Sequence, residues 1–278
     1  MTDGGGLPEL RVLPSAEAVA AATAEEIAVD LAEAIAARGV AHWVTTGGSS
    51  APGIYHHLGR PPLREGVDWS RVHVWWGDDR FVPSDHPLSN ALPLNQILLA
   101  SGGDEETGSP EGADVGGQGD GVRIPAAQLH EVPVTEAIAR SGGAAWAAVR
   151  YAAEIERAGP AAGPNGDPVF DVLIMGVGPD GHVLSIFPGS AVWDASANAV
   201  AVPAPTHVEP HVDRVTLHPR LIAAARRVIL ITTGAGKADL LARAWGGADV
   251  RELPVGAARL PQAVWLLDEA AASRLPRP

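Results

Sequence analysis

Asp180 and His182 stand two residues apart in the stretch MGVGPDGHVLSIFPG, residues 175–189. A neutral imidazole is the usual general base near pH 7, and a nearby carboxylate can fix its tautomer. An apolar run ends at Met175, so both side chains should follow the carboxyl end of a strand, where ligands bind in open α/β sheets. We therefore predict that Asp180 and His182 are catalytic residues that move a proton.

The same stretch carries Gly176, Gly178 and Gly181 in the G-x-G-x-x-G spacing of a dinucleotide-binding loop. Such a loop opens a full-length helix, and an acidic residue ends the next strand about 20 residues later. Here Pro188 and Gly189 would stop a helix after residues 182–187, and Asp194 has a loop-like context. The sequence favours a loop that does chemistry over one that binds a nucleotide.

A second glycine turn lies in VTTGGSSAPGIY, residues 44–55. An apolar run precedes this turn and a helix is expected to start after it. Gly47, Gly48 and Ser49 could therefore direct backbone N–H groups and a hydroxyl at an anion. The G-K-[ST] pattern of a P-loop is absent, which argues against a nucleoside triphosphate. The alternative is an ordinary glycine turn with a helix cap.

Two cations follow other apolar runs. In GDDRFVP, residues 77–83, Arg80 could pair with a phosphate or a developing oxyanion, and Asp78 or Asp79 could orient it or bind sugar hydroxyls. A surface ion pair is the alternative. In GAGK, residues 234–237, Lys237 opens a helix, where its charge and the helix dipole act together on an anion. Of the 20 basic residues, only Lys237 is a lysine.

Taken together, these four strand ends are more specific than any one of them. They predict a sugar phosphate held by backbone amides, Lys237 and Arg80, beside an Asp and a His that transfer a proton.

The elements that must position these residues follow from hydrophobic spacing. An Ala-rich helix over residues 15–38 is opened by Ser15 as N-cap, and short apolar runs predict strands at 40–45, 72–76, 170–175, 228–233 and 263–267. Their alternation with helices predicts an α/β fold, a single open, mostly parallel sheet with helices on both faces. We expect one domain over residues 1–278, with a flexible acidic, Gly-rich insertion at about 101–121.

Composition narrows the functional classes. No cysteine is present, so disulfide and thiolate chemistry are excluded. A net charge of −13 argues against a nucleic-acid surface, and no apolar run approaches the roughly 18 residues of a membrane span. We expect a soluble cytoplasmic protein with a small-molecule substrate, no nucleic-acid or membrane partner, and a monomeric or small homo-oligomeric state.

One possible metal motif fails on geometry. His207 and His211 are four residues apart, but Pro210 between them is incompatible with the helical H-E-x-x-H arrangement of a zinc site. The sequence predicts no metal.

The chain resembles the 6-phosphogluconolactonase family, within the superfamily that also contains glucosamine-6-phosphate isomerases/deaminases. The resemblance covers nearly the whole chain and is carried by the GGS turn, GDDRFVPSDHPLSN at 77–90, IPAAQLH at 124–130, MGVGPDGHVLSIFPG at 175–189, RVTLHPRLI at 214–222 and GAGKADLL at 234–241.

This resemblance implies a Rossmann-like fold of the sugar-phosphate isomerase type. It implies a cytoplasmic carboxylic ester hydrolase that opens 6-phospho-D-glucono-1,5-lactone in the oxidative pentose phosphate pathway, with no metal or organic cofactor. His182 is similar to the family's general base, Asp180 to its partner, Asp78 and Arg80 to the Asp and Arg of the D-E-R motif, and Lys237 to the phosphate-binding lysine.

Three positions depart from the family pattern, and one of them, the shifted proline, affects only a helix start. Asp79 stands where the family usually has Glu, which leaves the role of residue 79 open, and Ala51-Pro52 shifts the usual proline one place. The deaminases carry an additional Glu five residues after the His, where this chain has Phe187. Lactone hydrolysis is therefore favoured over the alternatives, a sugar-phosphate isomerase/deaminase and a non-enzymatic sugar-phosphate sensor.

Overall fold

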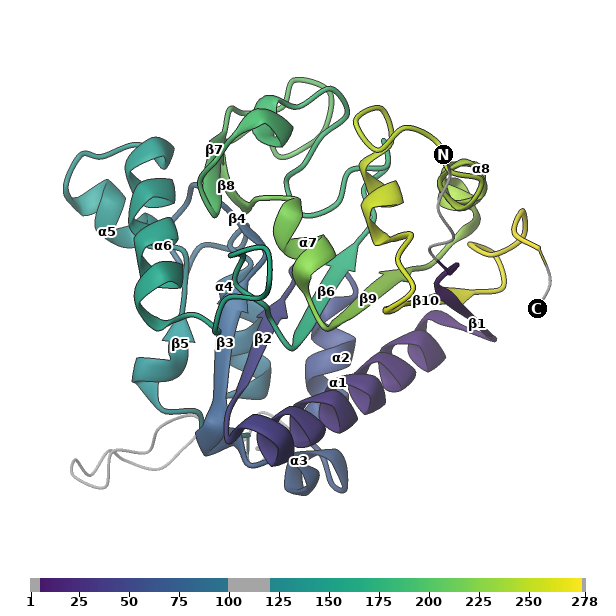
Figure 1. Ribbon diagram of the computed structural model, residues 1–278, viewed down its shortest axis with the longest axis horizontal. Helices are drawn as coiled ribbons and strands as arrows, with labels where there is room; N and C mark the ends of the chain where they lie inside the picture. The colour runs from purple at the N-terminus through teal and green to yellow at the C-terminus, as the bar shows by residue number, and fades with distance from the viewer. Residues whose placement is uncertain (1–5, 100–120, 277–278) are drawn as a thin grey trace, which may run out of the picture.

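The structure, a computed structural model, describes residues 6–99 and 121–276 (Figure 1). Seven strands build its main sheet: β1 (Glu9–Leu13), β2 (Ala41–Thr45), β3 (Val72–Trp76), β5 (Leu129–His130), β6 (Val172–Gly176), β9 (Arg227–Thr232) and β10 (Ala263–Asp268). They lie in the order β1-β10-β9-β6-β2-β3-β5, and every neighbouring pair is parallel. The predicted parallel sheet is confirmed.

The helices are α1 (Ala16–Arg38), α2 (Ala51–Leu58), α3 (Leu63–Gly66), α4 (Ala91–Pro93), α5 (Val134–Ala139), α6 (Ala144–Ala158), α7 (Arg220–Ala224) and α8 (Ala238–Trp245). The first of these begins and ends as its sequence predicts. The Ser15 side chain accepts a hydrogen bond from the backbone N–H of Ala18, and Gly39 ends the helix in the left-handed conformation with a φ of 82°.

Helices cover both faces of the sheet. In β2 and β3, Trp43 is paired with Val74, so Trp43 and Trp75 point to opposite faces. The ring of Trp43 contacts Tyr55 of α2, whereas the ring of Trp75 contacts Tyr151 of α6. Because α1 packs against α2, these two helices cover one face and α6 covers part of the other.

A second sheet was not predicted. It consists of β4 (Asp78–Arg80), β8 (Arg214–Leu217) and β7 (Ala199–Val202), in that order and antiparallel. None of these strands exceeds four residues, and β4 and β8 carry buried charged residues, so all three are shorter than the apolar runs by which strands were predicted. This sheet lies at the upper left of Figure 1.

Other differences are local. The predicted strand at 72–76 matches β3, the boundaries of the other predicted strands differ by up to two residues, and the edge strands β1 and β5 were missed. No helix forms over residues 182–187, where Val183 and Ile186 instead form an antiparallel bridge across a tight turn. The predicted insertion lies, except for Gly121, outside the described residues. Within the described ranges, no helix combines the length and apolar character needed to cross a membrane.

The sheet order brings the four predicted strand ends together. β9, β6, β2 and β3 are consecutive neighbours, so the loops that follow them meet at one edge of the sheet. Sequence positions separated by as many as 191 residues, from Thr46 to Lys237, therefore line one pocket.

Candidate functional site

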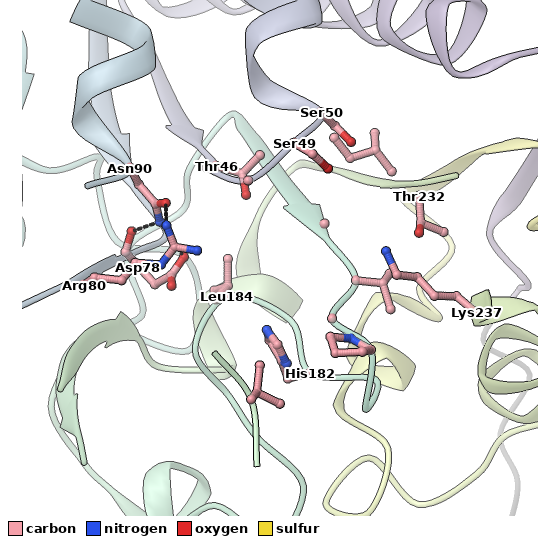
Figure 2. Close-up of a pocket in the computed structure, with 18 of the residues that line it drawn as sticks. Thr46, Ser49, Ser50, Asp78, Arg80, Asn90, His182, Leu184, Thr232 and Lys237 are labelled. Atoms are coloured by element: carbon pink, nitrogen blue, oxygen red, sulfur yellow. Dashed lines mark hydrogen bonds between the residues drawn. The ribbon is translucent and has the colours of Figure 1, made fainter. Parts of the chain in front are cut away.

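The pocket at this edge is shown in Figure 2. Among the residues that line it are most of the predicted site residues: Gly47, Gly48, Ser49, Asp78, Arg80, His182 and Lys237. Asp180 is not part of the lining, but it contacts the imidazole of His182, which is. Asp79 does not line the pocket either.

Asp180 and His182 form a hydrogen-bonded pair. The Nδ1 atom of His182 lies 2.5 Å from Oδ1 of Asp180, and the same oxygen accepts the backbone N–H of His182 at 3.1 Å. Nδ1–H therefore donates to the carboxylate, which leaves Nε2 as the free base, and Nε2 has no hydrogen-bond partner among the described residues. Figure 2 shows the ring inside the pocket.

The glycine spacing of this loop has a steric reason. A Cβ on Gly178 would overlap the imidazole of His182, and Gly181 adopts a φ of 85°, which L side chains rarely reach. The backbone N–H of Gly178 donates to the carbonyl of His182 at 2.8 Å and closes the loop. The glycines thus allow the backbone of the loop to pack directly against the ring of His182.

A second imidazole contacts the same carboxylate. The Nε2 atom of His207 lies 2.9 Å from Oδ2 of Asp180, so both carboxylate oxygens have partners. Burial by itself raises the pKa of Asp180, but the hydrogen bonds from His182 and His207 outweigh it and bring this pKa below its ordinary value. Asp180 is thus held ionised. Sequence reasoning considered His207 only as a metal ligand and missed this contact.

Phe187 forms an apolar wall behind the pair. Its ring centroid lies 4.6 Å from that of His182 and 5.8 Å from that of His207, and the side chain is buried. The position at which the deaminases carry a second acid/base group therefore holds a side chain without polar atoms.

The glycine turn and Lys237 form another part of the pocket. The backbone N–H groups of Gly47, Gly48 and Ser49 donate no hydrogen bond to another described residue, and α2 begins at Ala51. Lys237 makes no ion pair within the described residues, and burial lowers its pKa. Unpaired amides and a cation on one pocket are suited to an anion.

The side chains of β4 lie on the other side of His182 from Lys237 in Figure 2. Asp78 accepts hydrogen bonds from Ser185 Oγ at 2.5 Å and from Asn90 Nδ2 at 3.3 Å. Arg80 donates through Nη1 to the carbonyl of Leu88 and to Oδ1 of Asn90, at 2.9 and 2.7 Å. Asn90, which sequence reasoning missed, therefore fixes both β4 side chains.

Asp79 points away from this pocket into the protein. Its carboxylate accepts hydrogen bonds from the backbone N–H groups of Arg80 and Asn90 and from Ser89 Oγ, at 2.7–3.0 Å. Burial raises its pKa to about 7. Asp79, at the position where the family usually has Glu, thus stabilises the loop that carries Asn90.

Arg214 is a pocket residue that was not singled out from the sequence. It is paired with Arg80 across β8 and β4, is 2 % exposed, and its guanidinium lies 5.4 Å from the centre of the Phe187 ring. Burial lowers its pKa, partly offset by the charge of Asp78. The signal in the sequence that could have identified it is the stretch RVTLHPRLI at 214–222, which Arg214 opens.

Known proteins resemble this chain over nearly its whole length. The family model described as glucosamine-6-phosphate isomerases/6-phosphogluconolactonase matches residues 14–266. The 6-phosphogluconolactonase of Streptomyces coelicolor is 35% identical over 275 residues, covering 97% of this chain and 95% of that protein. The one of Mycobacterium tuberculosis is 34% identical over 271 residues, covering 96% and 98%. A solved 6-phosphogluconolactonase from Trypanosoma cruzi has the same fold, with a TM-score of 0.81 at 24% identity and full coverage of both chains.

Proposed function

We propose that this protein, which belongs to the glucosamine-6-phosphate isomerase/6-phosphogluconolactonase family, hydrolyses 6-phospho-D-glucono-1,5-lactone to 6-phosphogluconate. The observation that carries the proposal is the orientation of His182. Its Nε2 atom is free in a pocket lined by unpaired amides and cations, while Phe187 occupies the place of a second acid/base group. One base and one water suffice for lactone hydrolysis.

In this proposal the phosphate binds the amides of Gly47, Gly48 and Ser49 together with Lys237. These groups lie at one side of the pocket, where the N-terminus of α2 adds a favourable dipole. Figure 2 places Arg80 on the other side of His182, so we assign Arg80 as a donor to the carbonyl of the lactone and Asp78 as an acceptor from its hydroxyls. A sugar phosphate then places C1 beside the imidazole.

His182 takes a proton from a water molecule as the water oxygen attacks C1. The resulting imidazolium is stabilised by Asp180, and the negative charge on the carbonyl oxygen by the nearby arginines. When the tetrahedral intermediate breaks the bond between C1 and the ring oxygen, the imidazolium returns its proton to that oxygen. The product is an open-chain acid, and the reaction needs no metal or organic cofactor.

We place this reaction in the cytoplasm, as a step of the oxidative pentose phosphate pathway, catalysed by one domain acting as a monomer or small homo-oligomer.

An isomerase/deaminase is disfavoured because Phe187 is apolar and buried, and a pure sensor would have no use for the free Nε2 of His182.

The test is the disappearance of lactone generated in situ from glucose 6-phosphate near neutral pH. Wild type should accelerate it over the blank, and His182→Ala should lose about 100-fold or more in kcat, the usual contribution of a general base. A wild-type protein no faster than the spontaneous reaction would refute the lactonase, and binding of 6-phosphogluconate without turnover would favour the sensor.

A further inference from the structure

His207 makes a contact that the reaction as described does not use. It belongs to the segment between β7 and β8, residues 203–213, which reaches Asp180 from outside the pocket loop. Its side chain is 54% exposed, whereas those of Asp180 and His182 are 18% and 14% exposed. An exposed imidazole thus meets a largely buried carboxylate that already serves another imidazole.

The protons in this arrangement can be assigned from chemistry. An ionised carboxylate only accepts hydrogen bonds, so Asp180 receives N–H bonds from Nδ1 of His182 and from Nε2 of His207. His207 therefore has its proton on Nε2 in the neutral form, and Nδ1 is the atom that gains or loses a proton. The contact to Asp180 persists in both charge states, but the charge next to Asp180 changes.

Two consequences follow for His182. The hydrogen bond to Oδ2 fixes the carboxyl group so that Oδ1 faces Nδ1 of His182. It also draws electron density from the carboxylate, which then stabilises the imidazolium of His182 less strongly. Phe187 packs against both imidazoles, so one side of the group is apolar.

We propose that His207 is a positioning residue for His182: it orients Asp180 and sets how strongly that carboxylate supports the proton on the imidazole. The inference rests on the proposed lactone hydrolysis. His207 itself does not line the pocket, whereas its neighbours Val208 and Glu209 do.

Other charged groups act on His182 at the same time. Those that line the pocket come from several elements: Asp78 and Arg80 of β4, Arg214 of β8, Glu209 of the 203–213 segment, and Lys237 before α8. All are retained when His207 is replaced, so a change in the titration of His182 reports on residue 207.

The test compares wild type with His207→Ala and His207→Gln by NMR of ¹⁵N-labelled histidine rings, with the His182 signal identified from its loss in His182→Ala. Removing the donor should move the His182 ring signals' response to pH towards higher pH, because the carboxylate then supports the imidazolium more strongly. Gln places an N–H at a similar reach without titrating, and should restore most of the wild-type response. At pH 6 His207→Ala should lose about fivefold in kcat with KM within about twofold, and less in kcat at pH 8.

His211→Ala is the matched control. This histidine lies on the same segment. It contacts the carbonyl oxygen of Pro205 and the carboxylate of Glu209, and it does not contact Asp180. An unchanged His182 titration in His207→Ala would overturn the inference, as would an equal shift in His211→Ala. The NMR readout needs no substrate, so a shift as predicted in a protein that does not hydrolyse the lactone would overturn the proposed reaction and support the contact.

Discussion

At His182 the imidazole has room because residue 178 has no side chain. A methyl group there would coincide with the ring atoms of His182, so the glycine is a requirement of the histidine's position. The imidazole in turn determines where Asp180 and His207 can lie. The absence of a side chain at residue 178 therefore allows His182 and its two partners to take up these positions.

Gly178→Ala should move the imidazole away from Asp180. We expect kcat to fall about 100-fold, as on removal of the base, with an unchanged far-UV circular dichroism spectrum. Gly66→Ala is the control, because its added Cβ meets nothing within 4 Å and lies outside the pocket. Wild-type kcat in Gly178→Ala would show that the ring does not need this position.

At the scale of elements, the connection from β4 to α4 is organised by one buried carboxylate. Asp79 bonds two backbone N–H groups and Ser89 Oγ, and thereby fixes Asn90, which contacts both Asp78 and Arg80. Asp78 is bound in addition by Ser185, 107 residues further along the chain. Two side chains of the pocket thus depend on a loop, and that loop depends on Asp79.

The free energy of unfolding should depend on pH because Asp79 titrates. Burial raises its pKa from 3.8 to about 7, so between these values the folded protein keeps a proton that the unfolded chain has released. This group therefore favours folding at low pH, and the contribution is lost as pH rises through 7.

From pH 5 to pH 8, we expect the free energy of unfolding of wild type to fall by about 1–3 kcal/mol relative to Asp79→Asn. The amide that replaces the carboxyl group in this variant keeps an oxygen for the two backbone N–H groups but does not ionise. Urea unfolding of both proteins at the two pH values measures the difference. If the free energy of unfolding of both proteins changed equally with pH, Asp79 would not be the titrating group.

At the scale of the molecule, strand order concentrates positive charge in a chain of net charge −13. Arg80, Arg214 and Lys237 come from three separate elements and line the same pocket. With the unpaired amides of the glycine turn, they supply the local donors that an anionic substrate needs against the long-range repulsion of the whole protein.

The segment outside the described residues between Ala100 and Asp120 should be dispensable for this site. The residues on either side of it are joined by a bridge between Leu99 and Val122, and none of the described residues 91–99 and 121–175 lines the pocket. Replacing residues 101–120 by a short Gly-Ser linker should leave kcat and KM for the lactone within about twofold. A larger loss in the same assay, with the protein still folded, would assign the segment a part in the reaction.

The sequence by itself determined the elements and the short motifs, because both depend on neighbouring residues. Hydrophobic runs predicted five of the parallel strands, Ser15 was predicted as the N-cap of α1, and the glycine turns marked the strand ends that meet in the pocket. Local spacing also placed Asp180 beside His182. Strands of four residues or fewer were missed because so short a run gives little hydrophobic signal.

Only the tertiary structure decided which distant side chains complete the site. Asn90 between Asp78 and Arg80, Arg214 over Phe187, and His207 on Asp180 are contacts between different elements. They depend on strand order, register and side-chain orientation, and no local spacing encodes these. The same packing turned Asp79 inward and away from the pocket, where the burial of its carboxylate makes it part of the loop's support.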